Sequence, residues 1–356
     1  MNPRAQRAKT VAASIVFGPL LLRIYMATEH ITYVDPNGTG DYVSASSWEA
    51  DLGDTTGNLP SDDLIAVATC RCTGGTADTT AVTINGWTTS ADAYIKIWTD
   101  TAESYRHNGT YQTGNVYRLI VSGSTAINIV ENHVRIIGLI VESDTTSAIG
   151  DAGSANEAGL RFISHNIIKI TGGYKYAVKI YDSGNTFVIY NNLLISESDV
   201  GTSVIGINAW SNTIYIYSNT IVGGNNGVVR DAATVIAKNN LIYGSTNAAS
   251  GTFAAGSGYN ATNLASMGYT VTGGATADRV SQAFTFAGVD DYHLASNDTG
   301  ALGYGLNLYN DSVFPFQTDI DGQDRGGAAA AWDIGADEYV AAGAALPVFL
   351  YHYMHH

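Results

Sequence analysis

The sequence predicts an all-β fold, a right-handed single-stranded parallel β-helix. Three observations support this: a composition suited to strands and turns, a strand unit that recurs along the chain, and a column of asparagines in register. Of the 356 residues, 45% are hydrophobic, but only 14% are charged, against roughly 25% in typical soluble domains. Polar surface must therefore come largely from Asn, Thr, Ser, Gly and Tyr. With 39 Gly, 22 Tyr and 6 Pro, the mixture favours strands joined by tight turns over helices.

One strand unit recurs through the middle of the chain. The segments that begin at Thr186, Thr213 and Thr234 share an apolar strand, an asparagine and a second apolar run. The segment from Leu160 fits the same pattern, and the segment from Asn132 fits it more loosely. The offsets between units are 28, 26, 27 and 21 residues, which suits coils of three short strands and three turns. A period of this size is typical of a solenoid whose coils stack on one another.

The aligned units define three columns. The third position is always apolar (Val134, Phe162, Val188, Tyr215 and Ile236). The ninth is always a branched aliphatic residue (Ile140, Ile168, Leu194, Ile221 and Ile242). We expect both columns to fill the interior. The seventh position holds the asparagines, with Gly138 in the earliest unit, and predicts a structural ladder of stacked amides at a tight, left-handed corner (Asn166, Asn192, Asn219 and Asn240).

Further strands are expected on either side of these units. Between them lie short apolar runs at residues 177–181, 204–207 and 227–229, and earlier ones at residues 64–67, 81–84, 94–98 and 117–121. The region 245–285 is rich in Ala, Gly, Ser and Thr and has weak periodicity, so it predicts no definite coils.

Charge and cysteine content exclude some classes of partner. The formal net charge of −15 would repel a phosphate backbone, so we expect no nucleic acid partner, and anionic membrane surfaces are disfavoured for the same reason. Cys70 and Cys72 are two residues apart. On one strand their Cα atoms would be about 6.5–7 Å apart, near the upper limit for a disulfide. We therefore expect two buried, unbridged cysteines and no metal site.

The two ends of the chain differ from the β-helix, which we place at residues 29–340. Residues 1–28 carry basic residues followed by an apolar run, and three interpretations are open: a docking segment, a signal or anchor, or an inert extension. The run is too short to suggest a membrane span. Residues 341–356 form an Ala/Gly linker and an apolar-aromatic tail. Because such ends need burial, we expect a homo-oligomer or larger assembly formed through the termini.

Three motifs carry a family resemblance. The stretch from Ile31 to Asp41 resembles the opening of secreted and phage-borne β-helix proteins. The asparagine-bearing coils resemble the pectate-lyase-like parallel β-helix superfamily. The Asp-Ile-Gly-Ala-Asp-Glu run from Asp333 to Glu338 looks like the closing element of this group. The resemblance implies a location that is extracellular, at the cell surface or on a virion. It leaves the activity open, since the fold hosts lyases, hydrolases, adhesins and stalks.

The best candidate for catalysis lies in the turn before the repeated strand. Glycoside hydrolysis needs two carboxylates a fixed distance apart, and the register places Asp182 opposite Ala209 and Arg230, with Trp210 and Asp231 one residue on. Asp182 and Asp231 would be catalytic, and Trp210 and Arg230 would bind carbohydrate, the indole by stacking on a sugar ring. The alternative is that these acids end strands and that Arg230 pairs with Asp182 across coils.

Other polar residues give weaker signals. The Arg-x-Pro-x-x-Arg pattern of pectate lyases is absent. The run Asp319-x-Asp321-Gly322-x-Asp324 concentrates carboxylates but lacks EF-hand spacing, so we expect no metal and no cofactor, with Ca²⁺ as the alternative. His165 is expected in a turn, and His293 is expected to pack within the closing motif.

These observations favour a structural or adhesive protein over an enzyme. We expect an extracellular or virion-associated β-helix that assembles through its termini and contacts surface glycans. The alternative is a polysaccharide lyase or glycoside hydrolase that acts in a groove along the β-helix.

Overall fold

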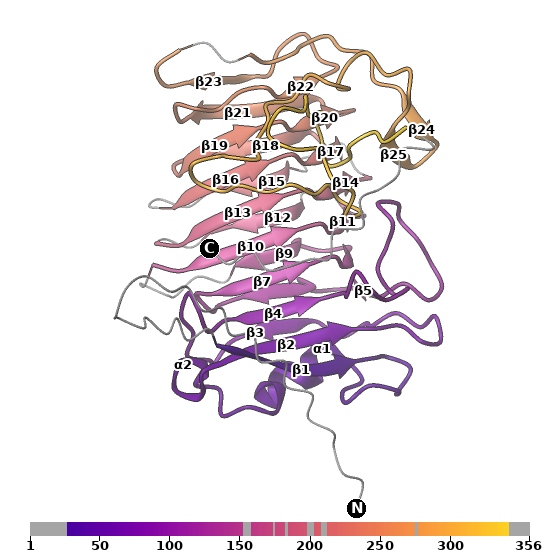
Figure 1. Cartoon of the computed structure of the whole chain (residues 1–356), viewed down its shortest axis with the longest axis vertical. Helices are drawn as coiled ribbons and strands as arrows, with labels where there is room; N and C mark the ends of the chain where they lie inside the picture. The colour runs from indigo at the N-terminus through magenta and orange to yellow at the C-terminus, as the bar shows by residue number, and fades with distance from the viewer. Residues whose placement is uncertain are drawn as a thin grey trace, which may run out of the picture.

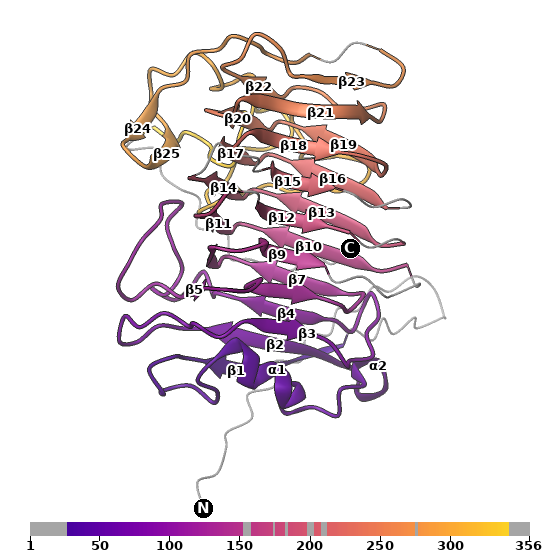
Figure 2. The same cartoon turned by 180° about the vertical axis from the view of Figure 1, so that it is seen from behind.

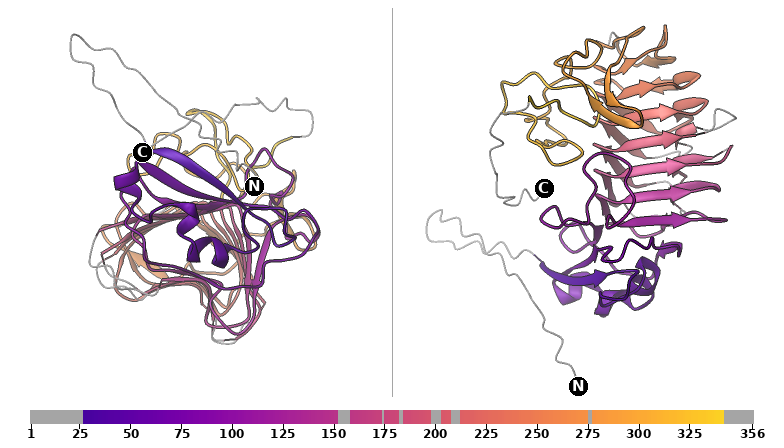
Figure 3. Two further views of the ribbon diagram at one scale, coloured as in Figure 1. Left: turned by 90° about the horizontal axis from the view of Figure 1, so that it is seen from below. Right: turned by 90° about the vertical axis from the view of Figure 1, so that its right-hand side faces the viewer.

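The chain folds into the predicted right-handed parallel β-helix (Figures 1 and 2). The computed structural model describes residues 27–151, 158–173, 175–181, 184–197, 203–207, 212–274 and 277–341. Three parallel sheets run along the long axis, and from β4 to β21 each coil contributes one short strand to each sheet. In the end-on view the sheets enclose a common interior (Figure 3, left). The fold class expected from the repeat is therefore confirmed.

The first two sheets meet at the corner that carries the asparagines. Sheet 1 has eight strands: β1 (Thr28–Val34), β2 (Leu64–Cys70), β4 (Ile95–Trp98), β7 (Val134–Ile137), β10 (Leu160–Ser164), β13 (Thr186–Tyr190), β16 (Thr213–Tyr217) and β19 (Thr234–Lys238). Sheet 2 has seven: β5 (Arg118–Val121), β8 (Ile140–Ser143), β11 (Ile167–Ile170), β14 (Leu193–Ser196), β17 (Thr220–Gly223), β20 (Leu241–Tyr243) and β22 (Ala261–Thr262).

The third sheet closes the coils. Sheet 3 has eight strands: β3 (Val82–Ile84), β6 (Ile127–Ile129), β9 (Ser147–Asp151), β12 (Tyr176–Ile180), β15 (Ser203–Ile207), β18 (Asn226–Arg230), β21 (Asn247–Phe253) and β23 (Tyr269–Val271). The expected early and intervening strands are all present. Coils also continue through β21 to β23, where the weak periodicity gave no clear prediction.

Short helices close the N-terminal end of the solenoid: α1 (Ala45–Ala50), η1 (Leu52–Asp54) and α2 (Leu59–Asp62). Helix α1 begins with a capping box in which the Ser44 side chain accepts from the backbone N–H of Ser47. It buries Trp48, whose ring stacks on Trp87 with centroids 5.4 Å apart. Trp48 also donates its indole N–H to Thr32 Oγ1 at 2.8 Å. These contacts cover the core at the N-terminal end of the described solenoid.

One of the two predicted interior columns, that of the third position, is displaced by one residue in the coils that follow Val134, which itself lies in the core. In the repeated strand, Phe187 and Ile189 point into the core, whereas the third-position residues Tyr215 and Ile236 face outward. The ninth-position residues from Ile168 onward do fill the interior (Ile168, Leu194, Ile221 and Ile242). Adjacent residues of a strand lie on opposite faces, so the predicted inner column at position three was wrong for these coils.

The ladder is confirmed and is longer than predicted. The backbone N–H of each predicted asparagine donates to the side-chain Oδ1 of the next. The distances are 3.0 Å from Asn166 to Asn192, 3.0 Å from Asn192 to Asn219 and 3.1 Å from Asn219 to Asn240. The ladder continues from Asn240 to Asn260 at 3.0 Å and from Asn260 to Asp278 at 2.9 Å. All four predicted asparagines are buried.

The left-handed corner lies one residue earlier than expected. Positive φ occurs at His165, Asn191, Ser218 and Asn239, each directly before a ladder asparagine. Gly138, with φ of 76°, belongs to this column, because Ile137 pairs with Ser164 and the next residue is therefore opposite His165. The placement of Gly138 in the ladder column was wrong.

After the last coil the chain turns back on itself. Residues 283–341, which we call the C-terminal arm, descend along one flank of the solenoid (Figure 3, right). The arm contains the antiparallel pair β24 (Phe286–Gly288) and β25 (Asp291–Leu294). Its aromatic and aliphatic side chains pack on outward-facing residues of sheet 1 in one cluster, formed by Leu308, Phe316 and Trp332 from the arm with Tyr215 and Tyr217 from the body.

Two features of the sequence complete this description. Cys70 and Cys72 are buried and unbridged, as predicted. No helix in the described part of the chain is long and apolar enough to cross a membrane. The apolar segments predicted at both termini lie outside the described residues.

Candidate functional site

The predicted catalytic group is described only in part. Asp182 and Trp210 lie outside the residues that the structure describes. Asp231 is exposed in the turn between β18 and β19. Arg230 donates to the carbonyl oxygens of Ala233 (2.6 Å) and Ala232 (3.0 Å), so its guanidinium holds its own turn. The expected alignment of Arg230 with Ala209 was wrong, because Arg230 pairs with Ile207.

A larger set of polar contacts lies at the corner against which the C-terminal arm packs. Side chains of the left-handed column point outward from this corner and bind the arm. Asn239 donates to the carbonyl oxygen of Leu306 at 2.7 Å and accepts from its N–H at 2.8 Å. Asn191 donates to the carbonyl oxygen of Thr318. Because left-handed backbone is costly for residues other than glycine, these contacts help to explain why asparagine occupies two positions of the column.

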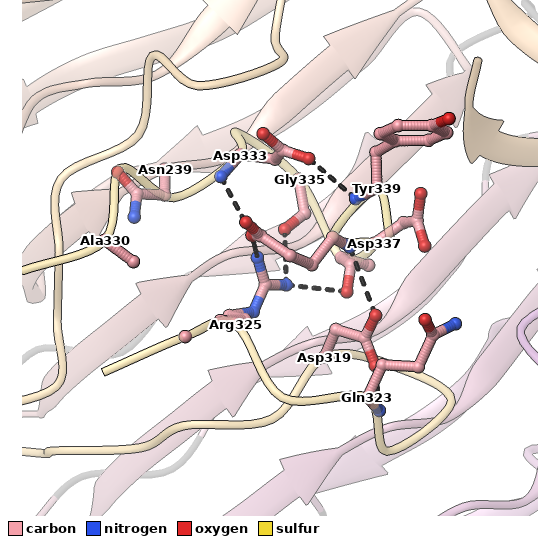
Figure 4. Close-up of polar contacts among 12 residues, drawn as sticks. Asn239, Asp319, Gln323, Arg325, Ala330, Asp333, Gly335, Asp337 and Tyr339 are labelled. Atoms are coloured by element: carbon pink, nitrogen blue, oxygen red, sulfur yellow. Dashed lines mark hydrogen bonds and ion pairs between the residues drawn. The ribbon is translucent and has the colours of Figure 1, made fainter. Parts of the chain in front are cut away.

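Arg325 is the centre of the attachment (Figure 4). Its guanidinium is 1% exposed and forms an ion pair with Glu338 at 3.1 Å. It also donates to Asn191 Oδ1 at 3.1 Å and to the carbonyl oxygens of Gly335 (2.9 Å) and Ala336 (2.7 Å). The planar guanidinium can serve several acceptors at once. One side chain therefore joins the closing motif, an arm loop and the body.

Beside Arg325 lies a carboxylate cluster, formed by Asp319, Asp321 and Asp337, whose oxygens lie within 4.8 Å of one another. His293 stands at its edge. The His293 Nδ1 atom is 2.5 Å from Asp291 Oδ1, and its Nε2 atom is 3.9 Å from Asp321 Oδ2. The cluster thus brings together the β24–β25 hairpin, the loop 318–324 and the closing motif.

Burial makes these acids hold protons unusually strongly. It raises the pKa of Asp337 to about 6, despite the opposing charge of His293. It raises the pKa of Glu338 to about 8, although Arg325 opposes the shift. Burial, together with a hydrogen bond to Asp321, raises the pKa of Asp319 well above its ordinary value. The arm therefore contains several carboxyl groups whose charge is suppressed by their surroundings.

Three carboxylates at this spacing are the type of ligand that Ca²⁺ prefers. However, the groups that face the cluster are mostly donors. Both oxygens of Asp319 accept main-chain N–H groups, from Gln323 at 2.7 Å and from Glu338 at 3.1 Å. One oxygen of Asp337 accepts from Leu294 N–H at 2.7 Å. The residues present fit a proton-sharing, hydrogen-bonded cluster better than a site with the six to eight oxygen ligands that Ca²⁺ takes.

A shallow pocket adjoins the cluster. It is lined by His293, Asp337, Leu193, Thr220 and their neighbours, and has about 180 Å³ of empty space including its open mouth. Small-molecule sites usually enclose roughly 300–1,000 Å³. The pocket is thus smaller than a typical small-molecule site.

A second polar group lies on the outer face of sheet 2. The Tyr111 hydroxyl donates to Glu142 Oε2 at 2.6 Å. Lys169 pairs with Glu197 at 2.5 Å and lies 4.9 Å from the centre of the Tyr111 ring. An aromatic ring beside carboxylates and an ammonium group could contact a glycan. These side chains come from β8, from β11, from the residue that follows β14 and from the loop 99–117.

Sequence reasoning identified the arm motifs but not their role. The ladder position was visible because one residue type recurs there. The residues before it (His165, Asn191, Ser218 and Asn239) share a backbone conformation, not a chemistry. Arg325 and Glu338 are 13 residues apart in a stretch without periodicity. Only the return of the arm along the flank brings them to Asn191.

Comparison with known proteins identifies no relative: no protein-family model, no curated protein and no solved structure matches this chain. The resemblance to the pectate-lyase-like superfamily rests on the motifs of the sequence.

Proposed function

We propose that this protein is a structural or adhesive β-helix of the pectate-lyase-like type that works outside the cytoplasm, at a cell surface or on a virion. It serves as a stiff body that assembles through its termini and contacts surface glycans. The observation that carries this proposal is the continuous ladder of buried amides, reinforced by an arm that is bonded to the same corner.

The ladder and the arm both favour stiffness. Buried hydrogen bonds that form a chain support one another, and each unmade bond would leave a polar group without water. The ladder links successive coils from Leu139, whose N–H donates to Asn166 Oδ1 at 2.9 Å, to Asp278. The arm then bonds to the same corner at Asn191 and Asn239. Arg325, Glu338 and Asp311 thus serve to hold the arm in place.

The assembly part of the proposal is tested on the termini. Deletion of residues 1–25 and 346–356 is expected to leave a folded, monomeric body, while the full chain forms an oligomer. Light scattering measures the mass of both, and circular dichroism checks the fold. An oligomeric mass that the deletion does not change would contradict assembly through the termini.

The alternative is a polysaccharide lyase or glycoside hydrolase, and the Tyr111, Glu142 and Lys169 group keeps this alternative open. A screen of neutral and uronic-acid polysaccharides for new reducing ends or unsaturated products separates the two functions. Asp231→Asn and Glu142→Gln serve as the comparison variants. Binding without products supports the adhesive function. Turnover that either variant abolishes would overturn it in favour of the enzyme.

A further inference from the structure

We propose that His293 and the carboxyl groups around it form a pH-sensitive latch, which holds the C-terminal arm against the body in mildly acidic solution and loosens as the pH rises. The latch does not depend on whether the protein is a scaffold or an enzyme, because it concerns only the attachment of the arm.

His293 stands where the arm meets the body. Its ring lies directly on Gly109 of the loop 99–117: a Cβ atom added to that glycine would be 2.3 Å from His293 Nε2. On the arm side, the ring is flanked by Asp291 of its own hairpin and by Asp321 of the loop 318–324. The same ring also borders the pocket floored by Leu193 and Thr220 of sheet 2. One imidazole therefore touches the body and two separate segments of the arm.

The carboxyl groups at this junction outnumber the cations. Those in or next to the cluster come from the hairpin, the loop 318–324 and the closing motif (Asp291, Asp319, Asp321, Asp333, Asp337 and Glu338). The permanent cations that act on the junction are Arg325 and, from the loop 99–117, Arg106. The body also contributes His107 and His165, but burial keeps both neutral by lowering their pKa, that of His107 to about 3. If every carboxyl group were ionised, six negative charges would face two arginines and His293.

Each resolved shift within the cluster acts in the same direction. Burial raises the pKa of Asp319, Asp333, Asp337 and Glu338. For His293, burial opposes protonation, but the charges of Asp337, Asp291 and Asp321 outweigh it and raise the pKa. An acid or histidine whose pKa is raised on docking stabilises the docked state at low pH, and this stabilisation is lost as the pH rises through the raised value. The values of about 6 for Asp337 and about 8 for Glu338 place the loss between mildly acidic and mildly alkaline pH.

Deprotonation would weaken three attachments together. His293 would lose its charge, Asp337 would gain one beside Asp319 and Asp321, and Glu338 would become a buried anion balanced by Arg325 and by one main-chain N–H, that of Asp333. Because these groups belong to the hairpin, the loop 318–324 and the closing motif, the repulsion falls on the three segments of the arm that line the pocket beside Gly109. The solenoid has a separate ladder and is not subject to this repulsion.

Hydrogen exchange on the full chain tests the latch. The amides of the arm are compared with the ladder amides of Asn192 and Asn219 in one sample, at about pH 5 and about pH 8.5. The intrinsic pH dependence of exchange cancels in the ratio of protection. We expect the protection of the arm relative to the ladder to fall on the order of tenfold or more between these values. The ladder amides also report whether a variant is folded.

Two variants and a cation control sharpen this test. Asp337→Asn imitates the protonated acid and is expected to keep the arm protected to higher pH, whereas Asp92→Asn, in an exposed turn of the body, should behave as the unsubstituted chain. His293→Gln is expected to lower arm protection at about pH 5 toward its alkaline level. A protection ratio that does not change with pH would overturn the latch. The latch would also be overturned if CaCl₂ alone restored the protection of the arm amides at alkaline pH and a chelator reversed this effect, because the cluster would then be a cation site.

Discussion

At the scale of single residues, the ladder asparagines do more than end a strand. Asn219 donates to the carbonyl oxygens of Ile189 (2.9 Å) and Tyr217 (3.1 Å), and its own Oδ1 accepts from Asn192. It is fully buried, so each of these partners would be left without water if the amide were removed. The column was predictable from sequence because a single residue type satisfies donors and acceptors of three consecutive coils.

This role predicts a large effect for one substitution. Asn219→Ala is expected to lower the free energy of unfolding by about 3–5 kcal/mol, because it leaves the N–H of Asn192 and the carbonyl oxygen of Ile189 unpaired in the core. Urea denaturation followed by circular dichroism measures the change. Asn297→Ala, at an exposed asparagine of the arm, is the matched control and should change little. An effect as small as that of the control would mean that the ladder does not stabilise the coils.

The left-handed column predicts two glycine substitutions with different outcomes. Ser218 has φ of 49°, and its buried hydroxyl has no hydrogen-bond partner among the described residues. Ser218→Gly removes left-handed strain while it adds flexibility to the unfolded chain, so we expect a change within about 0.5 kcal/mol. Asn191 has φ of 52° but bonds to Arg325 and Thr318. Asn191→Gly is expected to cost about 2–4 kcal/mol, since one lost bond is to a charged group. Denaturation midpoints of the two variants, measured together, check the contrast, and equal effects would contradict it.

At the scale of the elements, the strands could be predicted from sequence better than their faces. In β13, both the inward set (Phe187 and Ile189) and the outward set (Val188 and Tyr190) are apolar or aromatic. Alternation normally marks the buried face of a strand, but here the arm covers the outer face as well. With two buried faces the strand has no polar side, and the third-position column was therefore assigned to the wrong face.

The arm itself could be recognised as a closing element but not positioned. Its docking depends on single long-range contacts, such as Lys238 with Asp311 at 2.6 Å and Gly335 N–H with the carbonyl oxygen of Asn239 at 2.8 Å. No period in the sequence relates these residues. The predicted alignment of Arg230 failed for a related reason: Arg230 pairs with Ile207, two residues before the expected partner Ala209.

Arg325 gives the sharpest test of the arm as an element. Arg325→Met is expected to release the arm while the coils stay folded, because Glu338, Asn191 and two carbonyl oxygens lose their buried donor together. The opening free energy of arm amides, measured by hydrogen exchange, should fall by about 3 kcal/mol or more, with ladder amides unchanged. Arg230→Met is the matched control, since that side chain bonds only within its own turn among the described residues. Equal loss of protection in arm and ladder would show that the arm does not open separately.

At the scale of the whole molecule, the arm and the solenoid form one core with two layers. The inner layer lies within the three sheets, as in other solenoids whose coils contact mainly their neighbours. The outer layer lies between the arm and sheets 1 and 2, where Trp332 is fully buried and Leu308 is 1% exposed. Burial of each such side chain contributes about 1.5–3 kcal/mol. The arm therefore spans several coils that would otherwise be linked only to the next one.

This arrangement predicts that the arm is required for a soluble body. A chain that ends at residue 282 keeps every coil but uncovers the aromatic and aliphatic outer faces of sheets 1 and 2, which are lined by Phe162, Tyr190, Tyr215, Tyr217, Ile236, Ile167 and Leu193. An exposed apolar surface of this extent favours association. We expect the shortened chain to bind an apolar fluorescent dye and to aggregate, while its far-ultraviolet circular dichroism retains a β signal.

A chain that ends at residue 341 is the matched control, because it keeps the arm and removes only the segment beyond the described residues. It should remain dispersed and bind little dye. The contrary outcome is that the chain ending at residue 282 neither aggregates nor binds the dye. In that case the outer layer could not be part of the core, and the apolar outer faces of β13 and β16 would need another partner. If it aggregates as expected, the arm is the element that covers the second apolar face of the sheet and so keeps the protein dispersed.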